Sequence, residues 1–313
     1  YALAPSGDVF WEVALPTAPV GPPALGADGE IYQVDIAGNL SAFAPDGALL
    51  WRFQPPESKR PTVGPLVAPD GTIYYNVGGN VQAVSPDGEG LWQTKFRTFR
   101  AYTPLQLDAS GELLFFADDV INVPDQVLLE MESPVKVDRF FTGADGNNYL
   151  RSRHTVMQWQ RSGSRLEIGK KAQWSYRGIV YAEGAPANSG VTREGVIWLH
   201  YTAEFGATTI VWVDLEGQVL GTVYDDFRDS QVVTVLDQTG TVYACGYKDK
   251  GINRTSSLPQ CKAFVPGSEE PTWQVEIEEQ TEKITGGALA PGRLYLATGE
   301  GVLYAIGEGG PGP

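Results

Sequence analysis

The sequence predicts an all-β protein assembled from repeated units of four short antiparallel strands, and two observations predict it. Residues 24–53 and 66–96 align with each other over their whole length, at an offset of 41 or 42 residues. The composition includes 37 Gly and 22 Pro in 313 residues, together with 14 Tyr, 12 Phe and 8 Trp. Frequent turn residues and aromatic residues favour short strands over helices. A period of about 40 residues with four strands is typical of one blade of a β-propeller.

Each of the two clearest repeats alternates four strands with three turns. The Gly of an Asp-Gly pair accepts the positive φ of a hairpin turn, and Pro-Asp-Gly is likewise a turn sequence. The recurring Asp residues are therefore expected to shape hairpins. The matching positions are Asp28-Gly29 and Asp70-Gly71 in the first turn, Ile31-Tyr32 and Ile73-Tyr74 in the second strand, Gly38 and Gly79 in the second turn, Ala42 and Ala83 in the third strand, Pro45-Asp46-Gly47 and Pro86-Asp87-Gly88 in the third turn, and Trp51 and Trp92 in the fourth strand.

Five later repeats are more degenerate but keep the same order of strands and turns. Their expected turns contain Gly111, Gly146, Gly163, Gly195, Gly217, Gly240 and Gly292. Their expected strands are 113–116, 120–123 and 127–131 in the third repeat, 149–150, 156–160 and a strand from 166 in the fourth, 196–201, 209–214 and 219–224 in the fifth, 242–246, 261–265 and 272–277 in the sixth, and 294–297 and 302–306 in the seventh.

The seventh repeat has no fourth strand of its own, and the N-terminus offers one. Residues 8–13 contain Trp11 in the pattern of a fourth strand, without a repeat before them. Pairing this strand with residues 302–306 would close a ring of seven four-stranded blades and remove exposed sheet edges. Residues 1–7 also look like a third strand, so eight blades are the alternative. The whole chain, residues 1–313, is expected to form one domain.

The repeat pattern resembles the PQQ-like β-propeller family. The resemblance is carried by the Asp-Gly, Ile-Tyr, Ala, Pro-Asp-Gly and Trp positions of the first two repeats, and by Tyr243, Ala263, Trp273 and Tyr295 in the later ones. One branch of the family comprises quinoprotein dehydrogenases that bind pyrroloquinoline quinone and calcium. The other comprises non-catalytic propellers of the BamB type. The dehydrogenases often carry adjacent cysteines, which this chain lacks, so the resemblance implies the non-catalytic branch and no PQQ or calcium.

The two cysteines are predicted to form a disulfide. Cys245 falls on the second strand of the sixth repeat and Cys261 begins the third, so the two should face each other across a hairpin. A bridge would close the long polar loop between them and would stabilise the protein by about 3 kcal/mol. Disulfides persist in oxidising compartments, so we expect a periplasmic or cell-surface protein. Two thiols without a neighbouring His are a poor zinc site, and no metal site is expected.

No motif in the sequence indicates catalysis. The chain has two histidines, His154 and His200, and no nucleophile elbow or phosphate-binding loop. The net charge of −15 argues against binding to nucleic acid. Basic residues nevertheless gather in two stretches, and they are the candidate partner contacts. These are Lys95, Arg97 and Arg100 in the first stretch, and Arg151, Arg153, Lys170 and Lys171 in the second.

The sequence is therefore interpreted as a monomeric, exported propeller that binds protein partners, among them envelope proteins, and that is not an enzyme. No stretch is apolar over the ~18 residues that a membrane-spanning helix needs. The alternative is an enzyme or small-ligand binder that uses the central channel, as a quinoprotein would. A pocket with convergent carboxylates or perturbed titratable groups would favour that alternative.

Overall fold

The computed structural model describes most of the chain, and all its regular elements are β-strands. The described residues are 2–4, 8–57, 59–96, 105–116, 119–129, 139–152, 155–162, 165–173, 188–202, 208–225, 227–237, 239–248, 259–277, 284–290, 292–299 and 301–307. Within these residues there is no helical segment with the length and hydropathy needed to cross a membrane.

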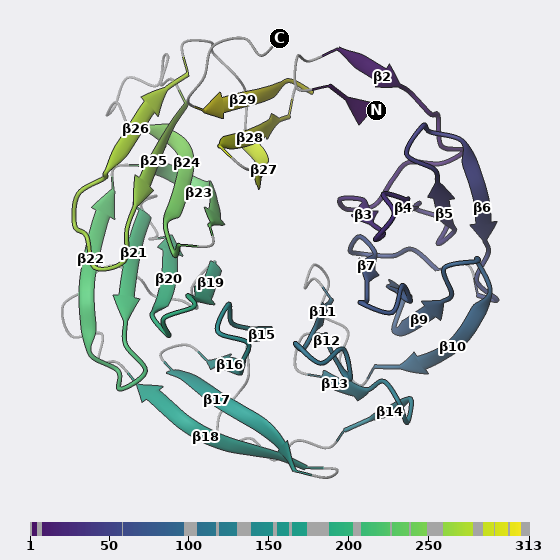
Figure 1. The fold of residues 1–313 in the computed structure, drawn as a ribbon, viewed down its shortest axis with the longest axis horizontal. Coiled ribbons are helices and arrows are strands. Elements are labelled where there is room, and N and C mark those ends of the chain that lie inside the picture. Colours follow the sequence, from purple (N-terminus) through teal and green to yellow (C-terminus); the bar gives the residue numbers. More distant parts are fainter. Residues whose placement is uncertain are drawn as a thin grey trace. The chain divides into compact units, whose positions relative to one another are not determined.

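The strands form sheets whose order follows the chain, with antiparallel neighbours (Figure 1). A two-stranded sheet contains β1 (Ala2–Leu3) and β2 (Val9–Trp11). The first two repeats form β3 (Ala24–Leu25), β4 (Ile31–Val34), β5 (Leu40–Phe43) and β6 (Leu49–Phe53), and then β7 (Leu66–Val67), β8 (Ile73–Val77), β9 (Asn80–Val84) and β10 (Gly90–Lys95). The third forms β11 (Gln106–Leu107), β12 (Leu113–Phe116), β13 (Asp119–Asn122) and β14 (Val127–Leu128).

The later repeats follow the same plan. Their strands are β15 (Arg139–Thr142), β16 (Asn148–Ser152), β17 (Thr155–Ser162) and β18 (Arg165–Gln173), then β19 (Asn188–Val191), β20 (Ile197–Thr202), β21 (Thr208–Val213) and β22 (Val219–Asp225), then β23 (Phe227–Leu236), β24 (Val242–Lys248), β25 (Pro259–Phe264) and β26 (Trp273–Glu276), and last the three-stranded sheet of β27 (Ile284–Ala290), β28 (Arg293–Thr298) and β29 (Leu303–Gly307).

The chain divides into two compact units. The N-terminal unit comprises Tyr1–Phe141 and Gln160–Glu167, and the C-terminal unit comprises Thr142–Trp159 and Ile168–Pro313. The single domain expected over residues 1–313 stays a prediction.

Turn chemistry accounts for the strand boundaries. Gly29, Gly47, Gly71 and Gly88 all have φ between 85° and 88°, as the Asp-Gly and Pro-Asp-Gly patterns predict. The Asp46 carboxylate accepts a hydrogen bond from Ala48 N at 3.0 Å, and Asp70 accepts one from Thr72 N at 2.9 Å, so these carboxylates do shape hairpins. In the weaker repeats, the expected turn glycines at 111, 146, 195, 217, 240 and 292 also have positive φ, while Gly163 lies outside the described residues. In the second repeat the positive φ of the second turn belongs to Gly78 rather than to Gly79.

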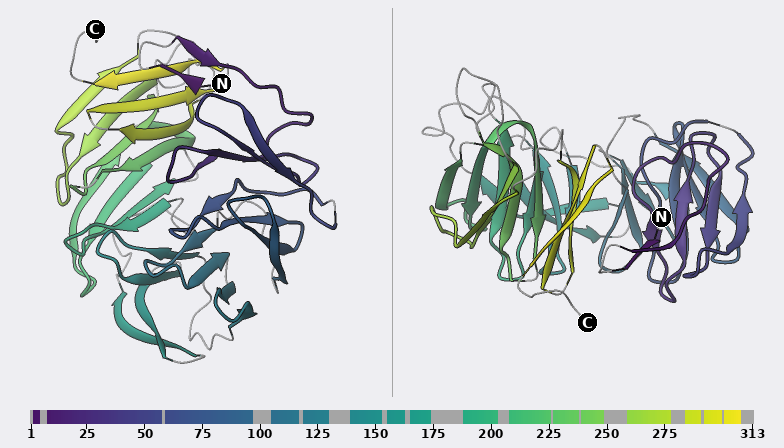
Figure 2. Two further views of the ribbon diagram at one scale, coloured as in Figure 1. Left: turned by 45° about the vertical axis from the view of Figure 1, so that its right-hand side comes forward. Right: turned by 90° about the horizontal axis from the view of Figure 1, so that it is seen from above.

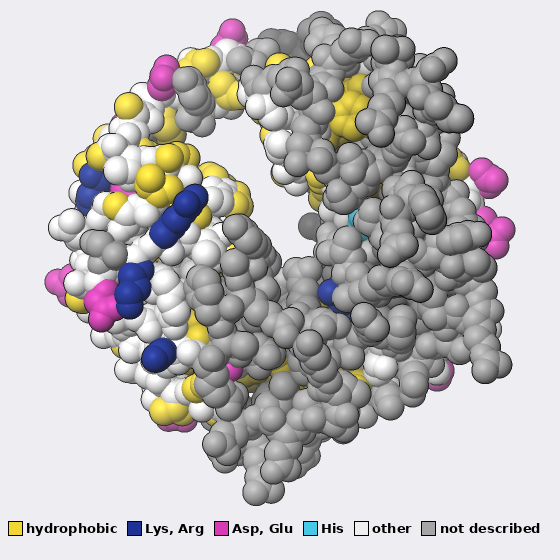
Figure 3. Space-filling view, turned by 180° about the vertical axis from the view of Figure 1, so that it is seen from behind, with side chains coloured by type: hydrophobic (Ala, Val, Ile, Leu, Met, Phe, Trp, Pro, Cys, Tyr) yellow, Lys and Arg dark blue, Asp and Glu magenta, His cyan; other side chains and the backbone are white. Residues whose placement is uncertain are grey.

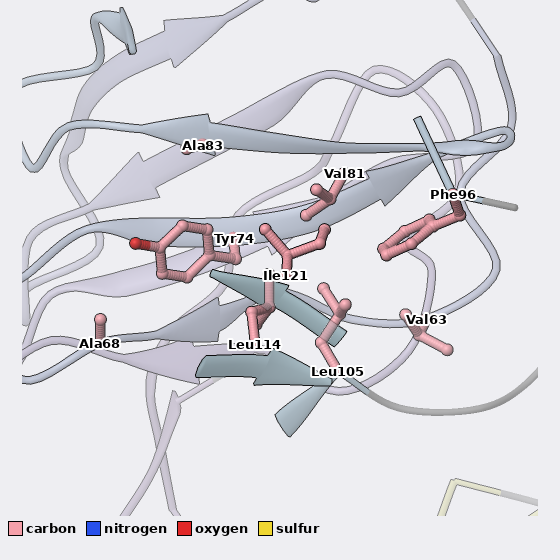
Figure 4. Close-up of a cluster of buried hydrophobic side chains, with 9 residues drawn as sticks. All are labelled: Val63, Ala68, Tyr74, Val81, Ala83, Phe96, Leu105, Leu114 and Ile121. Carbon is pink, nitrogen blue, oxygen red and sulfur yellow. The ribbon is translucent and has the colours of Figure 1, made fainter. Parts of the chain in front are cut away.

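Buried side chains fill the space between successive sheets of the N-terminal unit. Tyr74, Val81 and Ala83 of the second repeat pack against Leu114 and Ile121 of the third (Figure 4). The matching positions one repeat earlier, Tyr32, Leu40 and Ala42, pack together with Val34 against Ile73, Tyr75 and Val77. Strands β3 and β7 are in contact, while β6 and β10 lie at the opposite edges of their sheets (Figure 1). Each repeat therefore buries one face against the next.

The C-terminal unit repeats this packing. Trp198, Ile210 and Trp212 of the fifth repeat lie against Val242, Ala244 and Phe264 of the sixth. Cys245, Cys261 and Ile277 of the sixth then lie against Leu294 and Leu296 of the seventh.

The predicted closing strand pairs differently. Strand β2 pairs with β1, with Ala2 opposite Trp11, and its sheet contains no other strand. Strand β29 is the last strand of its three-stranded sheet. The expected pairing of residues 8–13 with 302–306 is therefore not formed among the described residues. A hairpin within the first eleven residues closes a short loop and needs far less chain ordering than a pairing between distant segments. The Ala4 N–Asp8 O bond at 2.8 Å matches Ala44 N–Ala48 O in the first repeat, so β1 and β2 have the arrangement of a third and a fourth strand. The number of blades stays a prediction.

Candidate protein-contact surface

Two tryptophans fasten consecutive repeats of the N-terminal unit together. Trp51 on β6 donates a hydrogen bond from Nε1 to the Pro86 carbonyl at 2.8 Å. Its ring lies over Gly88, where an added Cβ would come within 2.6 Å of Trp51 Cδ2. Trp11 on β2 makes the same pair of contacts with Pro45 and Gly47. We call each such pair of contacts a tryptophan lock. Each tryptophan lock holds an edge strand against the third turn of the next repeat, so the edge strands are fixed relative to one another.

These fixed edge strands expose a recurring apolar side chain next to each tryptophan. Phe10, Leu50 and Leu91 are 70%, 52% and 51% exposed, and we call them the outer-strand stripe. Successive side chains of a strand point to opposite faces, so burying the ring of a tryptophan turns the preceding residue outward. A single exposed leucine is ordinary, but one at the same register of three consecutive edge strands is typical of a contact surface. Sequence reasoning missed these residues, although alternation around each Trp was the signal that could have found them.

A groove of about 420 Å³ lies between the segment after β2 and strands β4 and β5 of the same unit. Its described lining has no acidic, basic or histidine side chain: it consists of Trp11, Val13, Leu15, Pro16, Thr17, Ala18, Pro19, Pro23, Ile31, Gln33 and Phe43. The Gln33 amide donates to the backbone carbonyls of Val20 and Val34, at 3.1 and 3.0 Å. The groove can hold apolar groups by contact, but its side chains offer nothing that transfers a proton.

The structure places only some of the predicted basic contact residues at the surface. Lys95 is exposed at the end of β10. Arg151 lies on β16 with only 5% of its surface exposed, so its side chain is not available to a partner, contrary to the prediction. Its strand lies between β15 and β17 in the four-stranded sheet of the fourth repeat. Arg97, Arg100 and Arg153 lie outside the described residues, and so do the side chains of Lys170 and Lys171 on β18.

The predicted disulfide is present. Cys245 on β24 and Cys261 on β25 lie directly opposite each other, with Cα atoms 4.1 Å apart and both side chains fully buried. Hairpin register accounts for the pairing, because opposite residues of adjacent antiparallel strands bring their Cβ atoms close together. In the part of the chain that the structure describes, no three His, Cys, Asp or Glu side chains are grouped so that they could hold a metal ion.

His200 is a buried polar residue that the sequence did not distinguish from a surface one. It lies on β20, opposite Asn188 on β19 and Ile210 on β21, and is 2% exposed. Among the residues that the structure describes, neither ring nitrogen has a hydrogen-bond partner. Burial lowers the pKa of His200 from 6.5 to about 4, so the ring is neutral at physiological pH. His154 lies outside the described residues.

We expect His200 to make the stability of the protein fall with acid. The unfolded chain binds a proton near pH 6.5 and the folded chain only near pH 4, so the free energy of unfolding is lost as pH falls through this window. The loss between pH 7.5 and pH 5 should be about 2 kcal/mol. Urea denaturation at each pH measures it.

The control for this prediction is His200→Leu. Leucine cannot titrate and removes two unpaired buried polar atoms, so the variant should match or exceed the parent's stability at pH 7.5 and lose less of it at pH 5. If the free energy of unfolding fell equally with pH in the parent and in the variant, the assignment to His200 would be contradicted.

Comparisons with known proteins agree with this architecture. Residues 1–123 match the family model described as outer membrane protein assembly factor BamB. None of the curated proteins matches the chain in sequence. The crystal structure of BamB from Moraxella catarrhalis superposes with a TM-score of 0.67 at 11% identity, covering 96% of this chain and 88% of BamB. The predicted resemblance to PQQ-like propellers of the BamB type is confirmed.

Other propellers are also similar in fold. The C-terminal WD40 domain of Sif2 gives a TM-score of 0.62 at 12% identity, over 96% of this chain and 84% of that one. A catalytically inactive virginiamycin B lyase from Staphylococcus aureus with quinupristin gives 0.55 at 11% identity, over 90% and 92%. At these identities the likeness establishes the fold, an all-β propeller, and nothing of the activity.

Proposed function

We propose that this chain is a non-enzymatic, extracytoplasmic scaffold that binds protein partners in the assembly of envelope or outer-membrane proteins. The observation that carries the proposal is the outer-strand stripe, Phe10, Leu50 and Leu91, held in register by tryptophan locks. A rigid frame that displays apolar side chains at fixed spacing loses little conformational entropy on binding. The match of residues 1–123 to a model of an outer-membrane assembly factor supports the envelope role.

The disulfide supports the extracytoplasmic location. A bridge between Cys245 and Cys261 persists in the periplasm or at the cell surface, whereas cytosolic thiols are kept reduced. The apolar groove of the N-terminal unit supports binding over catalysis, because the side chains of its wall carry no acid or base.

We expect Leu50→Glu to reduce partner binding by about fivefold or more, because a charge in the centre of an apolar contact must be desolvated. The tagged full chain would be incubated with an envelope extract of its source organism, and the bound proteins identified and quantified by mass spectrometry. Leu25→Glu is the matched control, because Leu25 is also an exposed leucine of the N-terminal unit, at 68%, but lies on β3.

Two outcomes would contradict the proposal. Equal recovery of the same proteins by the parent and by both variants would exclude the stripe as the contact. Turnover of an alcohol by the purified chain with pyrroloquinoline quinone and calcium added would identify an enzyme instead.

A further inference from the structure

The two ends of the N-terminal unit carry opposite charge. The right-hand view of Figure 2 shows the strands of this unit running between its two ends, with turns at each. The first and third turns of every repeat lie at one end. Exposed carboxylates gather there, and we call this end the acidic rim: Asp28, Asp46, Asp70, Asp87, Glu89 and Glu112.

The cationic side chains that the structure describes in this unit all lie at the other end, which we call the basic rim: Arg52, Lys59, Arg60 and Lys95. Arg52 is the penultimate residue of β6 and Lys95 the last of β10, where these strands approach the second turns of their repeats. Lys59 and Arg60 lie in the connection from β6 to β7. All four are exposed, and no other Lys or Arg side chain of this unit is among the described ones. Figure 3 shows basic side chains gathered on one face over these repeats.

The connection that carries Lys59 and Arg60 is fixed to the sheets beneath it. Asn76 Oδ1 accepts hydrogen bonds from Thr62 N at 3.1 Å and Val63 N at 3.2 Å. The Lys59 stem lies against Gly78, where an added Cβ would come within 2.6 Å of Lys59 Cδ. Pro55 and Pro61 are buried on either side. The two charges are therefore presented from an ordered segment, which lowers the entropic cost of binding.

The described carboxylates at this end do not neutralise the positive charge of the basic rim. Asp35 is 2% exposed, and its Oδ1 accepts hydrogen bonds from the Ala37 and Asn39 amides at 3.0 and 2.9 Å. Asp119 is 1% exposed. Among the described residues at this end, the exposed acids are Glu12 and Glu57. Glu57 contacts Lys59 at 2.6 Å in a surface ion pair of small energy. Arg52 is held by its Nε, which donates to Ser41 Oγ at 3.1 Å.

We infer that the basic rim binds an acidic, extended segment of a partner protein, an inference that rests on the proposed scaffold function and names the chemistry of one partner. A short acidic segment responds to the local field of four cations, because charges beyond about 10 Å are screened at ordinary ionic strength. A nucleic acid or an anionic membrane is larger than the rim and would also meet the rest of a chain of net charge −15. Charge complementarity of this kind sets the rate and orientation of encounter.

Anisotropy of a fluorescein-labelled hexaglutamate peptide tests the inference on the full chain. We expect saturable binding that weakens between about 20 mM and about 200 mM salt, as screening requires. Lys59→Gln combined with Arg60→Gln should weaken it by about fivefold or more, since it removes half of the rim's cations. Arg193→Glu is the matched control: it makes the same change in net charge at an exposed turn of the C-terminal unit, and should change binding less than about twofold.

The outcomes separate this inference from the scaffold function. Absence of peptide binding at low salt, or equal weakening of binding by both variants, would overturn the inference. If partners were still captured through the outer-strand stripe, the proposed scaffold function would be unaffected. Tighter binding of a thymidine hexanucleotide or of phosphatidylglycerol vesicles, lost in the double variant, would show that the rim recognises phosphate instead. Circular dichroism checks the fold of each variant, and Lys95→Gln provides a second test at a rim position on β10.

Discussion

Gly88→Ala is expected to lower the free energy of unfolding of the N-terminal unit by about 4 kcal/mol. Gly88 has φ of 87°, which an alanine adopts only at a cost of about 1 to 2 kcal/mol. The new Cβ would also lie within 2.6 Å of Trp51 Cδ2, so the indole must move. Moving it breaks the 2.8 Å hydrogen bond to Pro86 and disturbs a close-packed contact. Urea denaturation followed by far-ultraviolet circular dichroism measures the change.

Gly111→Ala separates the backbone cost from the loss of the lock. Gly111 belongs to the same unit and has φ of 75°, but the nearest atom to its added Cβ is Pro69 Cδ at 3.6 Å, an ordinary contact. This variant should lose only about 1 to 2 kcal/mol. Similar losses for the two variants would show that Trp51 does not fasten the repeats.

Removal of the disulfide has the second largest expected effect. Cys245→Ala with Cys261→Ala should reduce the free energy of unfolding by about 3 kcal/mol, because the bridge closes a loop across 16 positions and restricts the unfolded chain. The C-terminal unit should be the part affected, since both cysteines lie in the core between its sixth and seventh repeats. Guanidinium denaturation with and without dithiothreitol measures the loss.

The reductant supplies the control. Dithiothreitol should destabilise the parent by a similar amount and leave the double variant unchanged, because the variant has no bridge to reduce. The sulfurs are fully buried, so reduction of the parent should require local opening and should be slow under native conditions. If dithiothreitol left the unfolding midpoint of the parent unchanged, the bridge would not stabilise the protein.

Local sequence patterns predicted most of the strands, even in the degenerate repeats. The strand expected at 113–116 is β12, and those expected at 209–214 and 294–297 agree with β21 and β28 to within a residue at each end. The cysteine pairing was predictable for the same reason, since the two residues belong to adjacent strands of one hairpin. The partner of the N-terminal strand was not predictable in this way. Residues 8–13 and 302–306 are far apart in the chain, and nothing local specifies a register between them.

Surface properties needed the assembled sheets. In sequence, Arg151 resembles any other cation of its basic stretch, and only the packing of its strand shows it to be buried. The four cations of the basic rim are spread over 44 positions of sequence, from Arg52 to Lys95, and share one end of the unit because successive repeats run in the same sense. The exposure of Leu50 and Leu91 likewise follows from which face of β6 and β10 the tryptophan occupies.

The sequence by itself determined the repeat, its strands and turns, and the disulfide. These depend on backbone preferences and neighbour relations within about 40 residues, such as the positive φ that a turn requires of glycine. The tertiary structure alone decided which side chains reach solvent, which are buried without partners, and which charges stand together. Those properties arise where the face of one repeat is covered by the next, and a contact between distant segments has no signature in either segment alone.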